Sequence, residues 1–365
     1  MRVQLVDPPA FTPPYDRALA AALARAGARV ELVTSRFAYG QLPAPDGYAV
    51  RELFYRHALG APGSTLRRAA KLAEHVPDML RWRAHADDAD VVHIQWLTAP
   101  VLDLALLPRR PLVLTAHDLL PREPRLGQVR AQRRLLRRVD AVVTHSQHGR
   151  EQLVERIGVP ADRVHVIPHG AFAPGPPGRL PPELSDTGEP VVLFAGLLRP
   201  YKGLDTLLDA WRGIAAAQLW IAGRPMLDTA PLRARAPAGV SFVTRFVSDS
   251  ELAALLARAD VVVLPYRRTE RLDQSGVLAA ALGHGRAIVV SDVGGFSEVA
   301  ALGAARLVAP GDPAALRAAL MALIADPAAR AQLASGALAA ARGPLSWDAA
   351  ARATLDLYQR LRGRR

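Results

Sequence analysis

Short apolar segments of strand length alternate with amphipathic helical segments along almost the whole chain. The first half contains "RVQLV" (2–6), "PLVLTAH" (111–117) and "DAVVTHS" (140–146), separated by helical stretches such as "YDRALAAALARAG" (15–27). Apolar strands joined by helices are typical of parallel sheets that carry helices on both faces. The pattern therefore predicts the α/β class with doubly wound sheets.

The alternation is interrupted once, by a segment with five prolines between residues 171 and 189, and restarts with "PVVLFAG" (190–196). A chain of 365 residues is long enough for two domains. We therefore predict a first domain over 1–170, a proline-rich linker over 171–189, a second domain over 190–345 and a final helix over 346–365. Because ligands of open parallel sheets bind beyond the carboxyl ends of the strands, the expected site lies between two such edges.

Composition excludes several classes of function. The chain has no cysteine, which removes disulfides, thiolate zinc sites and cysteine nucleophiles. No apolar run reaches the roughly 18 residues that span a bilayer, and no apolar stretch of signal-peptide length follows the first residues, so we expect a cytoplasmic protein. The formal charge of +12 is spread along the chain. Since no recognition element accompanies it, we expect no nucleic-acid partner.

The basic residues are almost all arginine, because only Lys71 and Lys202 are lysines among 46 basic residues. A chain that uses arginine wherever either residue serves is expected to keep lysine where a compact ammonium is needed. Lys71 lies in the helical run "LRRAAKLAEHV" (66–76), and we favour the interpretation that a lysine occurs there by chance. Lys202 lies in a more informative context.

The segment "VVLFAGLLRPYKGLDTLLDAW" (191–211) predicts a buried strand that ends at Gly196, a loop with Arg199 and Lys202, and a helix that opens at Gly203. Backbone N–H groups at a helix start, beside a guanidinium and an ammonium, form an anion site suited to a phosphate or diphosphate. A basic surface turn is the alternative interpretation. The position of the second lysine favours the anion site.

The segment "GLLRPYKGLDTLLDA" (196–210) resembles the phosphate loop of the family-4 retaining glycosyltransferases, in a subgroup with "RPYKG" and "QSGVL". "VLTAHDLLP" (113–121) resembles the His-Asp turn of that family, and "LSWDAAARATLDLY" (345–358) resembles its last helix. The resemblance covers nearly the whole chain. It implies the GT-B fold, in which two Rossmann-like doubly wound domains face each other across a cleft. The first domain would bind the acceptor and the second the nucleotide-sugar, and the last helix would cross back to the first.

The resemblance also implies roles for individual residues. Lys202 would neutralise the diphosphate leaving group, and Arg199 is assigned the same task because Leu197 occupies the family's usual arginine position. His117 would lie near the reacting sugar carbon and the acceptor, with a structural turn residue as the alternative. The implied donor contacts in this part of the chain are the backbone at Gly196, Gly203 and Gly223 and the base region at Phe246 and Val247.

The stretch "RLDQSGVLAAALGHGR" (271–286) departs from the family, whose members have two glutamates eight residues apart here. Alignment on Gly276 puts those positions at Asp273 and Ala281, whereas alignment on Gly285 puts them at Leu272 and Ala280. The first carboxylate thus survives as Asp273 or Glu270, and the second, near the ribose, is absent. The remaining donor contacts would be Gln274, Ser275 and the N–H groups of Gly276, Val277 and Leu278 at a helix start. We hypothesise that ribose recognition is relaxed, so that a dTDP-sugar is accepted.

No metal site or resident cofactor is expected. His145 and His148 have an inviting spacing, but "THSQHG" (144–149) has the form of a strand end and an N-cap at Ser146, without nearby carboxylates or cysteines. The resemblance implies no required metal. The first loop, "DPPAFTPPYD" (7–16), has four prolines in place of the family's glycine-rich loop and is expected to shape the acceptor side.

Two segments bear on membrane contact. The basic helix "VRAQRRLLRRVD" (129–140) has an apolar seam so narrow that we favour a solvated helix over a patch for anionic lipid or an acidic acceptor. "DMLRWRAH" (78–85), with Trp82, is the better candidate for an aromatic anchor. Peripheral contact at the inner membrane face therefore stays open beside a cytoplasmic location.

The sequence thus predicts a metal-independent enzyme that transfers a sugar from a nucleotide-sugar donor to an acceptor hydroxyl with retention of anomeric configuration. The acceptor is expected to be a sugar, glycan, lipid or natural product. The alternatives are a non-catalytic nucleotide-sugar-binding GT-B protein and a GT-B epimerase or phosphorylase. The sequence specifies neither the donor base and sugar nor the oligomeric state.

Overall fold

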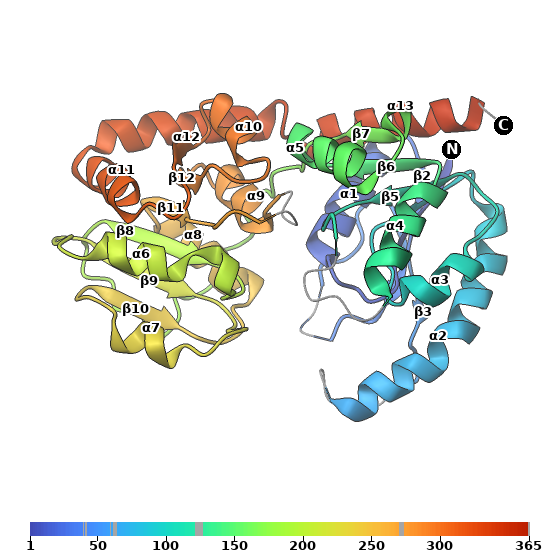
Figure 1. The fold of residues 1–365 in the computed structure, drawn as a ribbon, viewed down its shortest axis with the longest axis horizontal. Coiled ribbons are helices and arrows are strands. Elements are labelled where there is room, and N and C mark those ends of the chain that lie inside the picture. The colour runs from blue at the N-terminus through green and yellow to red at the C-terminus, as the bar shows by residue number, and fades with distance from the viewer. Residues whose placement is uncertain are drawn as a thin grey trace. The chain divides into compact units, whose positions relative to one another are not determined.

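The chain divides into two compact α/β units, each built around its own parallel sheet (Figure 1). The computed structural model describes residues 1–38, 40, 42–58, 60, 64–120, 127–269 and 274–363. The first unit comprises Met1–Pro168 and Trp347–Arg365, and the second comprises His169–Ser346. The predicted doubly wound α/β class is confirmed.

The described part of the first unit forms a seven-stranded parallel sheet in the order β3-β2-β1-β4-β5-β6-β7. The strands are β1 (Arg2–Asp7), β2 (Arg29–Ser35), β3 (Ala49–Phe54), β4 (Val91–Ile94), β5 (Leu112–Thr115), β6 (Ala141–Thr144) and β7 (Val164–Val166). Val3 pairs with Val30 of β2 on one side and with Val91 of β4 on the other. The topological switch point, where ligands of such sheets bind, therefore lies at the carboxyl ends of β1 and β4.

Helices cover this sheet and enclose its apolar core. They are α1 (Pro13–Arg25), α2 (Thr65–His85), α3 (Pro100–Leu106), α4 (Gln128–Arg138), α5 (Gln147–Glu151), which continues as a π turn (Gln152–Ile157), and α13 (Trp347–Gly363), with short 3₁₀ turns at Ala86–Asp88 and Ala161–Arg163. Ser146 caps α5, as predicted, because its hydroxyl accepts from the Gly149 N–H at 2.9 Å. Trp82 is fully buried in the core. The expectation that Trp82 anchors the protein in a membrane is therefore wrong.

The described part of the second unit forms a six-stranded parallel sheet in the order β10-β9-β8-β11-β12-β13. The strands are β8 (Val191–Ala195), β9 (Gln218–Ala222), β10 (Val240–Val243), β11 (Val261–Leu264), β12 (Ala287–Ser291) and β13 (Arg306–Val308). β8, β9, β11 and β12 are buried along their whole length, which explains their continuous apolar sequences. The switch point of this sheet lies at the carboxyl ends of β8 and β11.

Seven helices lie in the described part of the second unit. They are α6 (Leu204–Trp211), α7 (Ala230–Ala234), α8 (Asp249–Arg258), α9 (Gly276–Gly283), α10 (Phe296–Ala301), α11 (Pro313–Ala325) and α12 (Pro327–Arg342), with a 3₁₀ turn at Pro200–Lys202. Asp312 and Asp326 each precede a proline at the first helical position, and each carboxylate accepts two N–H groups of the first turn. Ser248 and Glu251 form a capping box at the start of α8.

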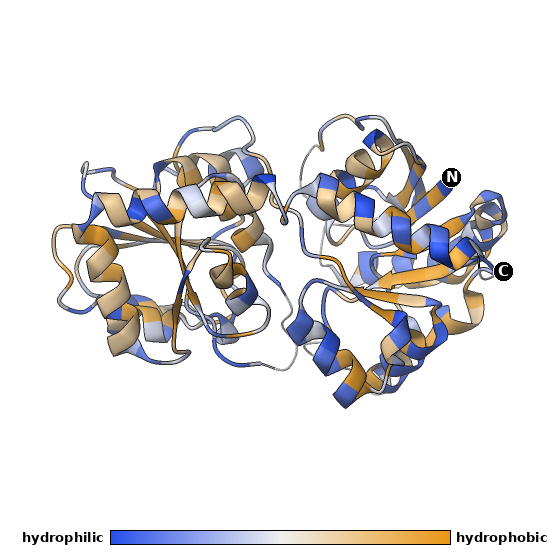
Figure 2. Cartoon of the chain, turned by 90° about the horizontal axis from the view of Figure 1, so that it is seen from above, coloured by the Kyte–Doolittle hydropathy of each residue, from blue (hydrophilic) through white to orange (hydrophobic). Residues whose placement is uncertain are grey.

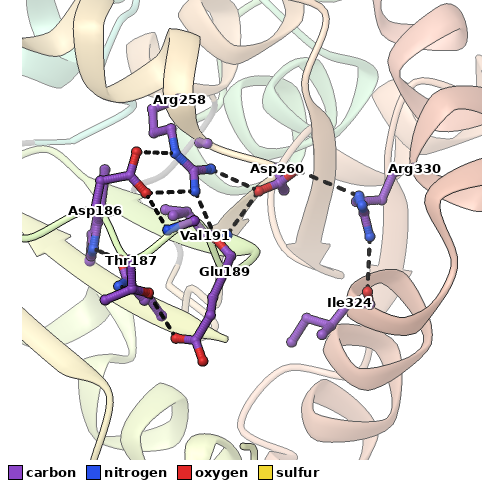
Figure 3. Close-up of polar contacts among 12 residues, drawn as sticks. Asp186, Thr187, Glu189, Val191, Arg258, Asp260, Ile324 and Arg330 are labelled. Atoms are coloured by element: carbon purple, nitrogen blue, oxygen red, sulfur yellow. Dashed lines mark hydrogen bonds and ion pairs between the residues drawn. The ribbon is translucent and has the colours of Figure 1, made fainter. Parts of the chain in front are cut away.

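The proline-rich segment predicted as a linker contains no helix or strand and packs onto the second unit. The N–H of Phe172 donates to Ala279 O at 3.0 Å. At its far end, the guanidinium of Arg258 donates to both carboxylate oxygens of Asp186 at 2.6 and 2.8 Å and also pairs with Asp260 (Figure 3). The segment is thus fixed at both ends to the domain that follows it.

The distribution of hydropathy matches this architecture. In Figure 2 the strands are hydrophobic, whereas the helices carry hydrophilic residues on part of their surface. Among the described residues, no helix combines the length and the apolar character needed to cross a bilayer.

Candidate functional site

The loop after β8 and the start of α9 meet at the switch point of the second sheet. Lys202 is almost fully buried. A methyl group placed on Gly196 would lie 3.0 Å from Lys202 Nζ and 3.0 Å from Val277 Cγ2. Lys202 and Val277 therefore both lie against the Gly196 backbone. The structure thus brings together three residues that the sequence predicted to contact the nucleotide-sugar donor.

Two further glycines allow this close packing of backbone. Gly203 has φ +69°, and a Cβ atom there would overlap the carbonyl oxygen of Pro265. Gly223 has φ +152°, and a Cβ atom there would overlap the carbonyl oxygen of Gly196. Both positions exclude any side chain, because the loops after β8, β9 and β11 approach one another there.

Tyr266, which the sequence reasoning missed, lies beneath the site. Its ring centroid is 5.1 Å from Lys202 Nζ, and its hydroxyl is hydrogen-bonded to Ser275 Oγ at 3.2 Å. The aromatic face stabilises the buried ammonium electrostatically. Tyr266 thus connects Lys202 to the residue that precedes α9. Its position directly after the strand segment "VVVLP" is the sequence feature that could have identified Tyr266 as a site residue.

Arg199 lies at the start of the 3₁₀ turn that carries Lys202. The Lys202 N–H donates to Arg199 O at 3.0 Å. The Arg199 Nε is buried and has no hydrogen-bond partner in the described part of the chain. A half-buried guanidinium in this state is suited to bind an anion.

The first turn of α9 presents backbone donors at the same place. Ala279 is the first residue of α9 whose N–H bonds back along the chain, to Ser275 O at 3.1 Å. The N–H groups of Gly276, Val277 and Leu278 precede it and make no bond to other described residues. Ser275 is buried, and its N–H donates to Gln274 Oε1 at 3.2 Å.

The segment 271–286 includes the two positions at which members of the family have glutamates, and the structure describes only the second of them. Asp273 and Glu270, the candidates for the first carboxylate, lie outside the described residues. Ala280 and Ala281, the two candidates for the second position, are both buried in the core of the unit. No carboxylate from α9 is therefore available to a ribose.

Phe246 and Val247, predicted for contact with the base, follow β10. The ring of Phe246 is exposed, whereas Val247 packs against the core. β9 separates β10 from β8 in the sheet. The two residues therefore lie at the same edge of the sheet as Lys202, but two strands away from it.

In the first unit, His117 lies after β5 within a cluster of aromatic rings. Its Nε2–H donates to Gln95 Oε1 at 2.9 Å, and its ring stacks on Trp96 with centroids 5.3 Å apart. Tyr15 meets His117 edge-on at 4.6 Å and also contacts Trp347, the first residue of α13, at 5.0 Å. These residues come from the loop after β4, from α1 and from α13, and together they fix the orientation of the imidazole. The sequence did not identify Gln95, Trp96 or Tyr15.

The loop after β1 uses its N–H groups internally. The buried Asp7 carboxylate accepts from the N–H of Phe11 at 2.6 Å and of Thr12 at 3.1 Å. Thr12 Oγ1 accepts from the Trp96 indole N–H at 3.0 Å and donates to Asp16 at 3.3 Å. Burial and the neighbouring Asp7 raise the pKa of Asp16 well above its usual range. These two amides therefore both donate to Asp7.

The histidines of "THSQHG" do not form a metal site with other described residues. Among these residues, no group of three or more His, Asp or Glu side chains could hold a metal ion. His145 is buried, and its Nδ1 bonds to Ile167 O at 2.9 Å. Its environment is that of a structural histidine beneath His117, whose ring centroid is 5.5 Å away.

Comparison with known proteins gives consistent matches over both units. The family model "Glycosyltransferase Family 4" matches residues 17–171, and the model "Glycosyl transferases group 1" matches residues 189–326. A curated relative, D-inositol 3-phosphate glycosyltransferase of Xylanimonas cellulosilytica, is 31% identical over 96% of this chain and 92% of its own length. Alpha-maltose-1-phosphate synthase of Mycolicibacterium smegmatis is 30% identical over 84% of this chain and 90% of its own length.

Solved structures match the fold of the whole chain. Sucrose-phosphate synthase from Thermosynechococcus elongatus has a TM-score of 0.76 at 21% identity, with full coverage of both chains. Anabaena HepE, solved in complex with UDP and glucose, has a TM-score of 0.72 at 20% identity and covers 98% of this chain and 99% of its own. The match extends over both sheets and the last helix.

Proposed function

Because the chain belongs to the family-4 glycosyltransferases with the two-domain GT-B fold, we propose that it transfers a sugar from a nucleotide-diphosphate sugar to an acceptor hydroxyl. We further propose that the transfer retains the anomeric configuration of the sugar. The observation that carries the proposal is the buried Lys202 ammonium, which lies against Gly196 and beside the first turn of α9. A buried cation next to backbone donors is suited to a diphosphate.

Departure of the nucleotide diphosphate builds negative charge on its outer phosphate. Lys202, Arg199 and the N–H groups of Gly276, Val277 and Leu278 would stabilise that charge, most strongly at the transition state. The ring of Tyr266 holds the ammonium in place before the donor arrives. The chemistry would thus depend on preorganised electrostatics rather than on a bound metal.

Retention requires the acceptor to attack from the face that the leaving group vacates. We infer that the leaving phosphate takes the proton of the acceptor hydroxyl on that face, with no covalent intermediate. His117, held by Gln95 and Trp96, would lie beside the reacting carbon, and Asp273 would bind sugar hydroxyls. We assign the reaction to the cytoplasm.

The relatives suggest which substrates to test first. One solved neighbour was crystallised with UDP-glucose, so a UDP-sugar is the first donor to test. Two curated relatives are named for a phosphorylated polyol or a phosphorylated sugar. We infer that a phosphorylated sugar or polyol is the first acceptor class to test.

The two lysines of the chain provide a matched pair of variants. Lys202→Met is expected to weaken UDP and UDP-glucose binding by about 10–100-fold, because it removes a charge-assisted contact in a buried site. Lys71→Met should change it less than about twofold, since Lys71 lies on α2 in the first unit. Isothermal titration measures both. Equal affinities of Lys202→Met and the wild type would refute the diphosphate site.

Turnover separates the enzyme from a non-catalytic binder. UDP release from UDP-glucose, followed by mass spectrometry of the acceptor products, should occur in the wild type and be lost in Lys202→Met. Binding without any UDP release across a panel of acceptors would support the binder. Formation of a sugar 1-phosphate from free phosphate would instead indicate a phosphorylase.

A further inference from the structure

The outward face of α2 in the first unit is apolar and exposed to solvent. Leu66 and Leu72 are each 64% exposed, Leu80 is 50% exposed and Val76 is 39% exposed. Ala69, Ala73 and Ala84 are exposed as well. Because these residues recur at intervals of three or four, they form a band along this helix of 21 residues.

The inward face of α2 accounts for its attachment to the fold, so the outward band has no role in the core. His75, Asp78, Met79 and Trp82 are the buried residues of the helix. Thirteen large apolar side chains are exposed in the described part of the chain. Four of them lie on α2, and two more, Val101 and Leu102, lie on the neighbouring α3. Figure 1 shows the two helices. Concentration of exposed apolar residues on one surface marks an interaction site.

Basic residues flank this apolar band, and one of the two acidic residues of α2 pairs with one of them. The arginines are Arg67, Arg68, Arg81 and Arg83. Glu74 accepts the N–H of His57 at 3.0 Å, and the buried Asp78 accepts from the Tyr55 N–H at 2.8 Å and pairs with Arg81 at 2.5 Å. No described carboxylate pairs with Arg68 or Arg83, so the rim of the band is positive at these two arginines.

We propose that α2 docks the protein on a membrane leaflet that contains anionic lipid. The leucines and Val76 enter the boundary between head groups and acyl chains, and the arginines bind lipid phosphates. The proposal is independent of the sugar-transfer chemistry. It keeps the segment 78–85, which lies on α2, but assigns the contact to the exposed Leu80 because Trp82 is buried. It replaces the segment 129–140, because the leucines of α4, Leu135 and Leu136, are buried.

Charge favours a bilayer over a second copy of the chain. Two copies joined through their α2 faces would bring the arginine rims of both together, and like charges repel. A leaflet with anionic head groups instead supplies phosphates to these arginines.

Vesicle co-sedimentation of the full chain tests the proposal. Vesicles of phosphatidylcholine alone are compared with an equal mixture of phosphatidylcholine and phosphatidylglycerol. The wild type should bind the mixed vesicles at least about tenfold more strongly, and Leu72→Gln/Leu80→Gln should lose at least about tenfold in partitioning. Arg68→Gln/Arg83→Gln should lose the preference for the anionic lipid.

The control is Leu302→Gln/Met321→Gln, which alters two exposed apolar residues of the second unit and should bind like the wild type. Circular dichroism melting establishes that each variant is folded. Equal vesicle binding by Leu72→Gln/Leu80→Gln and the wild type would overturn the proposal. Absence of vesicle binding, together with a dimer that this variant abolishes in light scattering, would overturn it in favour of self-association.

Discussion

The hydroxyl of Tyr358, on the last helix, is hydrogen-bonded to Nδ1 of His93, on β4, at 2.6 Å, although 265 residues separate them in the chain. The other ring nitrogen of His93 is bonded to Thr115 Oγ1 at 2.7 Å. All three side chains are buried, and burial lowers the pKa of His93 to about 3. The histidine is thus a neutral link between two strands and the last helix of the first unit.

Tyr358→Phe tests the strength of this link. The change leaves a buried nitrogen of His93 without its partner, so we expect a loss of about 1–3 kcal/mol in the free energy of unfolding. Urea denaturation followed by circular dichroism measures it. Tyr48→Phe, which alters a half-buried tyrosine outside the core, should change the stability by less than about 0.5 kcal/mol. Similar values for the two variants would contradict the role of the hydrogen bond.

Asp16→Asn tests the buried acid pair after β1. The folded protein holds a proton on Asp16 that the unfolded chain releases above the ordinary pKa of 3.8. The contribution of this bound proton to the free energy of unfolding of the wild type therefore falls as the pH rises from 3.8 through the raised pKa of Asp16. Asparagine carries no such proton.

The free energy of unfolding of Asp16→Asn relative to the wild type should therefore increase with pH, by up to about 1.4 kcal/mol for each pH unit within that window. Urea denaturation at about pH 5 and about pH 8 measures the difference. Asp46→Asn, at an exposed position, is the control. A difference between Asp16→Asn and the wild type that does not change with pH would show that Asp16 is ionised in the folded protein.

The sequence predicted the central strands but not three strands at the sheet edges. β3, β7 and β10 are all terminal in their sheets. They are only partly buried, so their sequences lack the continuous apolar run that marks a central parallel strand. Prolines in the segment 171–189 correctly indicated an absence of helix and strand. They did not indicate that the segment packs onto the second unit, because packing depends on residues far away in sequence.

The candidate site shows the same division between local and distant information. Gly196, Lys202 and Gly203 could be predicted together because they lie within one loop. Tyr266 and Gln95 could not, because their contacts with Lys202 and His117 depend on which strands are neighbours in the sheet. Lys202 and Tyr266 meet because β8 and β11 pair with each other.

Tyr266→Leu and Tyr266→Phe separate the two contributions of this side chain. Leucine removes the ring near the Lys202 ammonium, and we expect UDP affinity to fall by about 3–30-fold. Phenylalanine keeps the ring and loses only the bond to Ser275, so the fall should be less than about threefold. Isothermal titration with UDP measures both variants. A larger loss for phenylalanine than for leucine would assign the role to the hydroxyl instead.

The burial of Ala280 and Ala281 leads to a prediction about the donor. A site that binds a substrate hydroxyl through a buried carboxylate discriminates strongly against the deoxy analogue. α9 has no carboxylate at either candidate position. We therefore expect the affinities for UDP, dUDP and dTDP to agree within about fivefold, as measured by isothermal titration. Comparison of UDP with dUDP isolates the 2′-hydroxyl, and comparison of dUDP with dTDP isolates the base methyl group. Measurable binding of UDP with none of dUDP would mean that another residue recognises the ribose.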